Sequence, residues 1–191
     1  MKLKRRGEIL SEAAQIFCEN GYRGTNVRDL GQRLGVEAAS LYNYFESKED
    51  ILKTICFNML DQFEAGRQEV LIMGGTPEEM FRHAVATHIG MLKRNLYSST
   101  VYLQDWRYLY NPEDYARFKA HKDGYEAYFL AIMEACNKTG FLKIKNVRHD
   151  FNFVFSAMNW VVQWDRIEDE FENEVKTTVD IITDLILGGL K

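Results

Sequence analysis

Apolar residues recur along most of this chain at intervals of three and four, the spacing that places them on one face of an α-helix. In the first such segment Ile9, Ala13 and Phe17 share a face, and the Asn-Gly-Tyr stretch at 20–22 provides a stop. No segment shows the sustained alternation typical of a β-strand, and the chain has only 2 prolines. The pattern predicts an all-α protein of about nine helices.

Three later helix starts are marked by a capping side chain that precedes an acidic residue by three positions. These lie at 47–50 (SKED), 76–79 (TPEE) and 111–114 (NPED). In the last two, proline occupies the first helical position, where its missing N–H costs nothing. The helix that starts at Ser47 is expected to be long and to end near Met73.

The stretch NVRDLGQRLGVEAASLYNYFESKEDIL, residues 26–52, predicts two short helices around a tight turn. Leu30 and Leu34 lie on the inward face of the first, Gly35 ends it, and Leu41 and Phe45 point inward from the second. The outer arc of the second helix carries Ala39, Ser40, Tyr42, Asn43 and Tyr44. Exposed aromatic residues on a helix this short are typical of a DNA-binding helix-turn-helix, whose second helix enters the major groove.

Together with the preceding RGEILSEAAQIFCENGYRGTNVRDL, this stretch resembles the TetR family of bacterial transcriptional regulators over roughly residues 5–53. The resemblance implies a helix-turn-helix DNA-binding domain at 1–50, containing three helices, and a helical ligand-binding and dimerisation domain at 51–191. One departure from the family pattern is Tyr44, where many members carry His. The resemblance implies two partners. One is a double-stranded DNA operator with an inverted-repeat sequence, and the other is a second copy of the chain in a homodimer.

Carried over to this chain, the resemblance assigns DNA contacts that suit the chemistry of the side chains. Phosphate contacts are expected from Thr25, Tyr42, Tyr44 and Lys48, and base contacts from Ser40, Asn43 and Arg28, with Ala39 offering a methyl group to thymine. Asn43 is expected to bond adenine in bidentate fashion, because its amide both donates and accepts.

The charge distribution is compatible with this interpretation. The whole chain carries a net charge of −4, whereas residues 1–35 contain seven Lys or Arg and four acidic residues. An acidic protein with one basic end can meet DNA through that end. No apolar run is long enough for a membrane span or a signal peptide, so we expect a cytoplasmic protein without membrane partners. The 3 cysteines show no metal or disulfide spacing.

Residues 147–166 predict a helix that is apolar on two opposite faces. It is either a central core helix or a helix that lends one face to a partner subunit and the other to an internal cavity. On the second interpretation, one face joins the apolar stripe of the last helix in a four-helix contact between two subunits. The predicted dimer contacts are Phe151, Phe155, Met158, Val162, Val175, Val179, Ile182 and Ile186.

Aromatic residues in the second half suggest a ligand pocket, although such stripes commonly form core. The segments DWRYL, KDGYEAYF and AMNWVVQW are similar to an acyl-CoA-responsive TetR branch, in which Arg often stands where Lys122 does. The predicted pocket residues are Tyr102, Trp106, Arg107, Lys122, Tyr125, Phe129, Asn159, Trp160, Gln163 and Trp164. Aromatic rings suit an acyl slot, Asn159 and Gln163 suit amides, and Arg107 and Lys122 suit phosphates unless they are solvated surface cations.

The predicted function is therefore a ligand-responsive transcriptional regulator, a repressor released by a small hydrophobic or acyl-CoA-type effector. Two alternatives stay open: a helical ligand-binding or partner-binding protein without DNA affinity, and a multidrug-type regulator that senses neutral apolar compounds. The chain has no paired Glu-x-x-His motif, P-loop, dinucleotide motif or nucleophile elbow, so we expect no catalytic residue, metal or cofactor.

Overall fold

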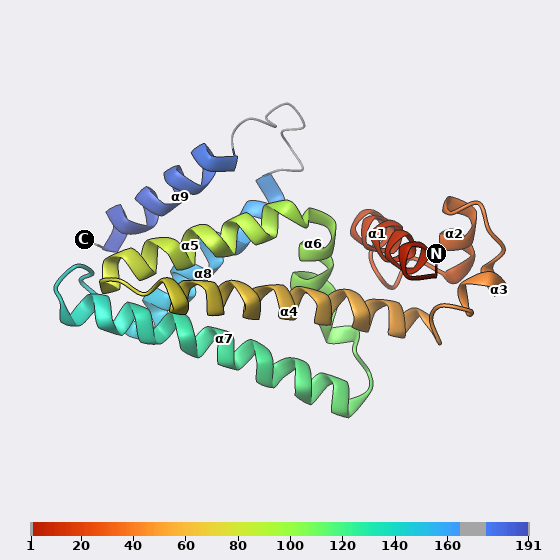
Figure 1. Cartoon of the computed structure of the whole chain (residues 1–191), viewed down its shortest axis with the longest axis horizontal. Coiled ribbons are helices and arrows are strands. Elements are labelled where there is room, and N and C mark those ends of the chain that lie inside the picture. The colour runs from red at the N-terminus through yellow and green to blue at the C-terminus, as the bar shows by residue number, and fades with distance from the viewer. Residues whose placement is uncertain (1, 165–174, 191) are drawn as a thin grey trace. The chain divides into compact units, whose positions relative to one another are not determined.

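The computed structural model describes residues 2–164 and 175–190, and within them it contains nine α-helices, one short 3₁₀ helix and no strand (Figure 1). The all-α prediction is confirmed. The helices are α1 (Lys2–Asn20), α2 (Val27–Arg33), α3 (Ala38–Leu41), α4 (Lys48–Met73), α5 (Pro77–Arg94), α6 (Leu96–Asp105), η1 (Trp106–Tyr108), α7 (Pro112–Lys138), α8 (Val147–Trp164) and α9 (Val175–Leu190). No helix in these two ranges is long and apolar enough to cross a membrane.

The helix starts follow the capping signals in the sequence. The Ser47 hydroxyl accepts from the Asp50 N–H at 3.0 Å, and Thr76 and Glu79 cap each other at the start of α5. Hydrogen bonds from Thr76 lower the pKa of the Glu79 carboxyl. At the start of α7 the Asn111 side chain accepts from the backbone of the first turn. These local bonds satisfy N–H groups that a helix leaves unpaired at its start.

The chain forms two compact units. Unit 1 comprises residues 1–60 and 95–119, and its first helix, α1, packs against α2 and α6. Its core contains side chains spaced along α1 as predicted, among them Ile9, Ala13 and Phe17, which are at most 1% exposed. Leu30 of α2 and Leu41 of α3 complete this core.

Unit 2 comprises residues 61–94 and 120–191, of which 165–174 and 191 lie outside the described residues. Within it α5 packs against α8 and α9, and α8 also contacts α9 (Figure 1). The largest fully buried side chains include Phe63, Phe81, Phe129 and Phe151. Aromatic rings therefore fill much of this core.

The compact units differ from the predicted domains 1–50 and 51–191. Unit 1 also takes the first turns of α4 and α7, together with α6, because α6 supplies the partner for α1. Two helices contribute to both units: α4 runs unbroken from Lys48 to Met73, and α7 from Pro112 to Lys138. The expected length of α4 is confirmed.

Candidate functional site

The geometry of the helix-turn-helix depends on two glycines. Gly35 has a φ of +64°, a left-handed conformation that side chains disfavour, and it follows α2. Gly31 lies where α2 meets the start of α3, since a Cβ there would be 2.8 Å from the Val36 carbonyl oxygen and 3.0 Å from the Ala38 nitrogen. The Val36 N–H donates to the Gly31 carbonyl at 2.9 Å, which fixes the angle between the two helices.

The surface of α3 and the turn after it presents most of the predicted DNA contacts. Tyr42 is 56% exposed, and Ala39, Asn43 and Arg28 are exposed as well, whereas Ser40 and Tyr44 are half-buried. Leu41 and Phe45, at most 3% exposed, point into the unit and hold the segment in place. Tyr42 and Asn43 lie just beyond α3, in successive turns that bond back to Ala39 and Ser40.

Two predicted phosphate contacts are engaged inside the protein instead. Thr25 is 1% exposed and its hydroxyl donates to the Gly21 carbonyl at 3.0 Å, so it is not available to DNA. The Lys48 ammonium donates to the Tyr22 and Thr25 carbonyls, both at 2.8 Å, and lies 4.2 Å from the Tyr22 ring centre. Partial burial lowers the pKa of Lys48. Lys48 therefore ties the turn before α2 to the start of α4.

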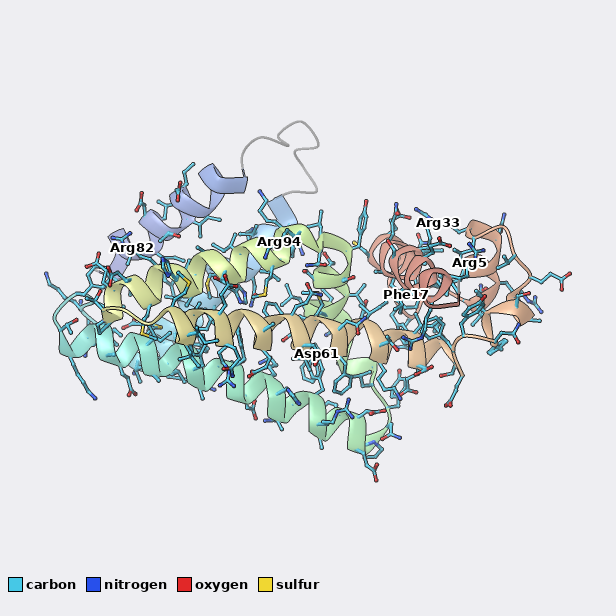
Figure 2. All side chains as sticks on the ribbon, in the orientation of Figure 1. Arg5, Phe17, Arg33, Asp61, Arg82 and Arg94 are labelled. Atoms are coloured by element: carbon cyan, nitrogen blue, oxygen red, sulfur yellow. The ribbon has the colours of Figure 1, made fainter. Side chains whose placement is uncertain are left out.

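Salt bridges also link α1 to α2. The Arg33 guanidinium lies 3.0 Å from Glu12 and 2.8 Å from Glu19. Arg33 is labelled in Figure 2. Hydrogen bonds from Gln15 and Arg33 lower the pKa of Glu19. The pairs are solvent-exposed, so they contribute orientation more than stability.

In unit 2, an aromatic cluster surrounds His88 of α5, which is 2% exposed. The imidazole stacks on Phe63 at 5.0 Å between ring centres and is within 6 Å of three further rings. These rings belong to Tyr125 and Phe129 of α7 and to Phe155 of α8. Two predicted pocket residues, Tyr125 and Phe129, therefore lie together here.

Both imidazole nitrogens of His88 are hydrogen-bonded. The Nε2 atom is 3.0 Å from Asn159 Oδ1, and the Nδ1 atom is 3.2 Å from the Tyr125 hydroxyl. An amide oxygen only accepts, so the hydrogen-bond network assigns the proton to Nε2, which leaves Nδ1 to accept from Tyr125. Burial lowers the pKa of His88 to about 4, and the ring is neutral at neutral pH.

Other predicted pocket residues lie elsewhere. Tyr102 and Trp106 belong to unit 1, where both contact Phe118, Trp106 by stacking at 5.3 Å between ring centres. Arg107 is exposed and donates to the Gln104 carbonyl, and Lys122 pairs with Glu126. Both cations thus have local partners on their own segments.

The faces predicted for α8 and α9 need correction. Phe151, Met158 and Val162 are at most 2% exposed and Phe155 lies in the aromatic cluster, so this face of α8 packs inside its own unit. Trp160, expected in the pocket, is 59% exposed. Helical periodicity revealed two apolar stripes on α8 but not which of them faces α5.

On α9 the predicted contacts Ile182 and Ile186 are likewise buried, at 3% and 1% exposure. The exposed apolar side chains are Ile181 and Leu185, at 54% and 65%. Gln163 is half-buried. The side chains of Trp164, Val175 and Val179, also among the predicted contacts, lie outside the described residues.

Two family models match this chain. Residues 9–55 match "Bacterial regulatory proteins, tetR family", and residues 74–190 match "Tetracyclin repressor-like, C-terminal domain". The chain belongs to the TetR family. It is a ligand-responsive, DNA-binding transcriptional regulator of a family that acts as dimers, which confirms the predicted family and class of function.

Among TetR-family relatives, the chain is 26% identical over 166 residues to the HTH-type transcriptional repressor KstR2 of Rhodococcus jostii, covering 86% of this chain and 81% of that one. It is 31% identical to the crystal structure of PfmR from Thermus thermophilus, with a TM-score of 0.81 and coverage of 96% and 98%. The fold also matches AibR, crystallised with isovaleryl coenzyme A and operator DNA, at 20% identity, a TM-score of 0.78 and 97% coverage of each chain.

His88 is the residue of the aromatic cluster that sequence analysis did not identify. No residue near His88 in the sequence has the spacing of a metal site, so no motif singles it out. The position of His88 in the sequence predicts that it is buried, because it lies at helical spacing from Phe81, Val85 and Leu92. A polar residue on such a buried stripe needs hydrogen-bond partners, and these come from helices distant in sequence.

Proposed function

We propose that this chain is a repressor that binds an inverted-repeat operator as a homodimer in the cytoplasm and is released by an acyl-CoA or a related acyl compound. The observation that supports DNA binding is the exposed surface formed by Arg28, Ala39, Tyr42 and Asn43. These side chains have no hydrogen-bond partner within the described chain, while the buried side chains of Leu30, Leu41 and Phe45 hold the segment in place. Tyr42 and Tyr44 are assigned to phosphates, and Asn43, Ser40 and Arg28 to bases.

The dimer is proposed to form through the outward faces of α8 and α9. Phe153 and Trp160 on α8, and Ile181 and Leu185 on α9, are each more than half exposed in the single chain. A Cβ at Gly189 would lie 3.8 Å from the Phe153 ring, so the two apolar faces are contiguous. Contiguous exposed apolar side chains favour association, and a two-fold axis pairs the same surface of both copies.

The effector site is proposed at the aromatic cluster around His88. Tyr125, Phe129 and Phe155 supply apolar surface, and Asn159 supplies polar contacts at its edge. The similarity to the Rhodococcus jostii repressor supports a repressor, and the AibR complex with isovaleryl coenzyme A supports an acyl-CoA effector. No catalytic role is proposed for any residue.

Two experiments test this function. Selection of protein-bound DNA from a random pool is expected to return an inverted repeat, because a two-fold dimer reads two half-sites. A thermal-shift screen with isovaleryl-, octanoyl- and palmitoyl-CoA, and with neutral apolar dyes as comparison, is expected to show stabilisation by an acyl-CoA. Recovery of no enriched DNA, or stabilisation by the dyes alone, would contradict the proposal.

A further inference from the structure

Asn159 has an amide nitrogen that the protein itself does not use. Its Oδ1 accepts from His88 Nε2 at 3.0 Å, and no other hydrogen bond forms to the side chain within the described residues. The residue is half-buried, and its nitrogen is not among the buried polar atoms without a partner. The nitrogen is therefore accessible and carries two unused N–H donors.

His88 and Tyr125 fix the orientation of that amide. The Oδ1 atom of Asn159 faces Nε2 of His88 at 3.0 Å, which assigns the ring proton to Nε2 and leaves Nδ1 to accept from the Tyr125 hydroxyl. A flipped amide would set two N–H groups against Nε2–H and lose the bond. The stacked ring of Phe63 and the surrounding aromatic residues hold the imidazole itself. Asn159 is thus held as a donor and not as an acceptor.

A second observation points to the same ligand chemistry. Among the described residues, two buried side-chain atoms lack a hydrogen-bond partner: Tyr128 Oη and Arg67 Nε. The Tyr128 ring contacts Tyr125 and Phe129, and Arg67 interacts electrostatically with Tyr128. An arginine nitrogen only donates and a tyrosine hydroxyl readily does. The α4 and α7 side of the cluster therefore also offers donors that call for an oxygen acceptor.

Open space lies beside Arg67, on the α4 and α7 side of the cluster. A groove of about 430 Å³ between α4 and α7 is lined by Glu64, Arg67, Ala120, His121 and Gly124. A Cβ at Gly124 would meet nothing within 4 Å. A ligand that lies in the groove can approach Arg67, whose Nη2 atom is 2.5 Å from Glu64 and whose Nε remains unpaired.

We propose that Asn159, oriented by His88, recognises the effector by donating its amide N–H to the carbonyl or carboxylate oxygen of an acyl group. This inference rests on the proposed function, because it names the residue that reads the effector of that same site. His88 acts as a positioning residue and does not touch the ligand. The recognised chemistry is an acyl oxygen, carried either by a coenzyme A thioester or by a free acid.

The test compares ligands that differ in this oxygen alone. Operator DNA is titrated by fluorescence anisotropy in the presence of octanoyl-CoA, of S-octyl-CoA, a thioether that lacks the carbonyl, and of octanoate. The wild-type protein is expected to respond to octanoyl-CoA at about 2- to 10-fold lower concentration than to S-octyl-CoA, the range for one neutral hydrogen bond. A response to octanoate as strong as to octanoyl-CoA would identify the free acid as the source.

Asn159→Leu and Asn159→Asp are expected to abolish the preference for the carbonyl. The Asp variant keeps an acceptor for His88 but has no donor for the ligand, so it separates recognition from folding. Asn152→Asp is the matched control, because Asn152 is exposed on the same helix two turns earlier and should leave the preference intact. His88→Phe keeps the stacking but loses both hydrogen bonds and should abolish the preference, whereas His88→Gln, which retains a donor toward Asn159, should restore part of it.

The outcomes are distinguishable. If wild type responds to octanoyl-CoA and both Asn159 variants keep the full preference over S-octyl-CoA, the role of Asn159 is wrong while the proposed function stands. An equal wild-type response to octanoyl-CoA and S-octyl-CoA also overturns this role. If operator affinity responds to none of isovaleryl-, octanoyl- and palmitoyl-CoA or octanoate, the proposed function fails and the inference falls with it.

Discussion

The residues of unit 1 considered for DNA binding fall into two groups. Some hold the unit together, and others expose side chains that can contact DNA. The Lys48 ammonium bonds two backbone carbonyls, and Thr25 is buried, so both build the unit. Tyr42 and Asn43 are exposed and have no partner within the described chain. Substitutions in the two groups should therefore have different effects: loss of stability in the first and loss of DNA affinity or sequence preference in the second.

Asn43→Ala is expected to relax sequence preference at one base pair in each half-site, at a cost of about 1–3 kcal/mol, because it removes a base contact. Tyr42→Phe is expected to weaken binding to all sequences alike, because it removes a phosphate contact. DNA selection with each variant measures both effects. An unchanged consensus for Asn43→Ala would remove Asn43 from the base contacts.

His88 makes the free energy of unfolding depend on pH. Its pKa is lowered to about 4 in the native state, against about 6.5 in the unfolded chain, so the unfolded state binds more protons between these values. Stability should fall by about 3 kcal/mol as the pH drops from 6.5 to 4, beyond the loss seen in His88→Gln. Urea denaturation at fixed protein concentration measures the difference. Parallel curves for the two proteins would contradict the neutral buried imidazole.

At the scale of elements, the sequence predicted which helices form and how long they are better than it predicted which face of each helix is buried. Capping residues such as Asn111 and Thr76 act locally, so the starts of α5 and α7 were predictable. The assignment of Trp160 to the interior was wrong, because both stripes of α8 are apolar and only the packing of α5 against one of them settles which is buried. The partners of His88 lie 37 and 71 residues away along the chain, and no local pattern reveals such pairs.

The close contact between α2 and α3 determines the position of the exposed side chains of Tyr42 and Asn43. Gly31→Ala is expected to destabilise the protein by about 1–3 kcal/mol and to reduce operator affinity, because the new Cβ would press on the Val36 carbonyl and the Ala38 nitrogen. Gly7→Ala is the control, since a Cβ there meets nothing within 4 Å in α1 and should stabilise the helix slightly. Thermal denaturation and operator titration measure the two effects. Equal behaviour of the two variants would show that α3 does not require this close approach.

At the scale of the whole molecule, regulation requires two copies of the chain and a connection between effector and DNA. The α4 helix offers that connection, because it is continuous for 26 residues and contributes to both compact units. An effector changes operator affinity only if it binds one arrangement of the protein better than another. The effect expected for such coupling is about 5- to 150-fold in affinity.

The dimer is tested by placing a charge on its proposed surface. Leu185→Asp is expected to dissociate the protein, because the charge would be buried against the second copy, whereas Leu185 is 65% exposed in one chain and tolerates substitution there. Ile72→Asp, at an 83% exposed position on α4, is the control and should remain dimeric. Sedimentation velocity distinguishes the two. A dimeric Leu185→Asp protein would place the interface on another surface.

The most direct measurement of the central claim is the affinity of the wild-type dimer for its selected operator, titrated by fluorescence anisotropy with and without a saturating acyl-CoA. We expect two recognition surfaces to bind one inverted repeat, and the acyl-CoA to lower the affinity by about 5- to 150-fold. The same affinity with and without isovaleryl-, octanoyl- and palmitoyl-CoA, for an operator that the protein binds specifically, would contradict an acyl-responsive repressor.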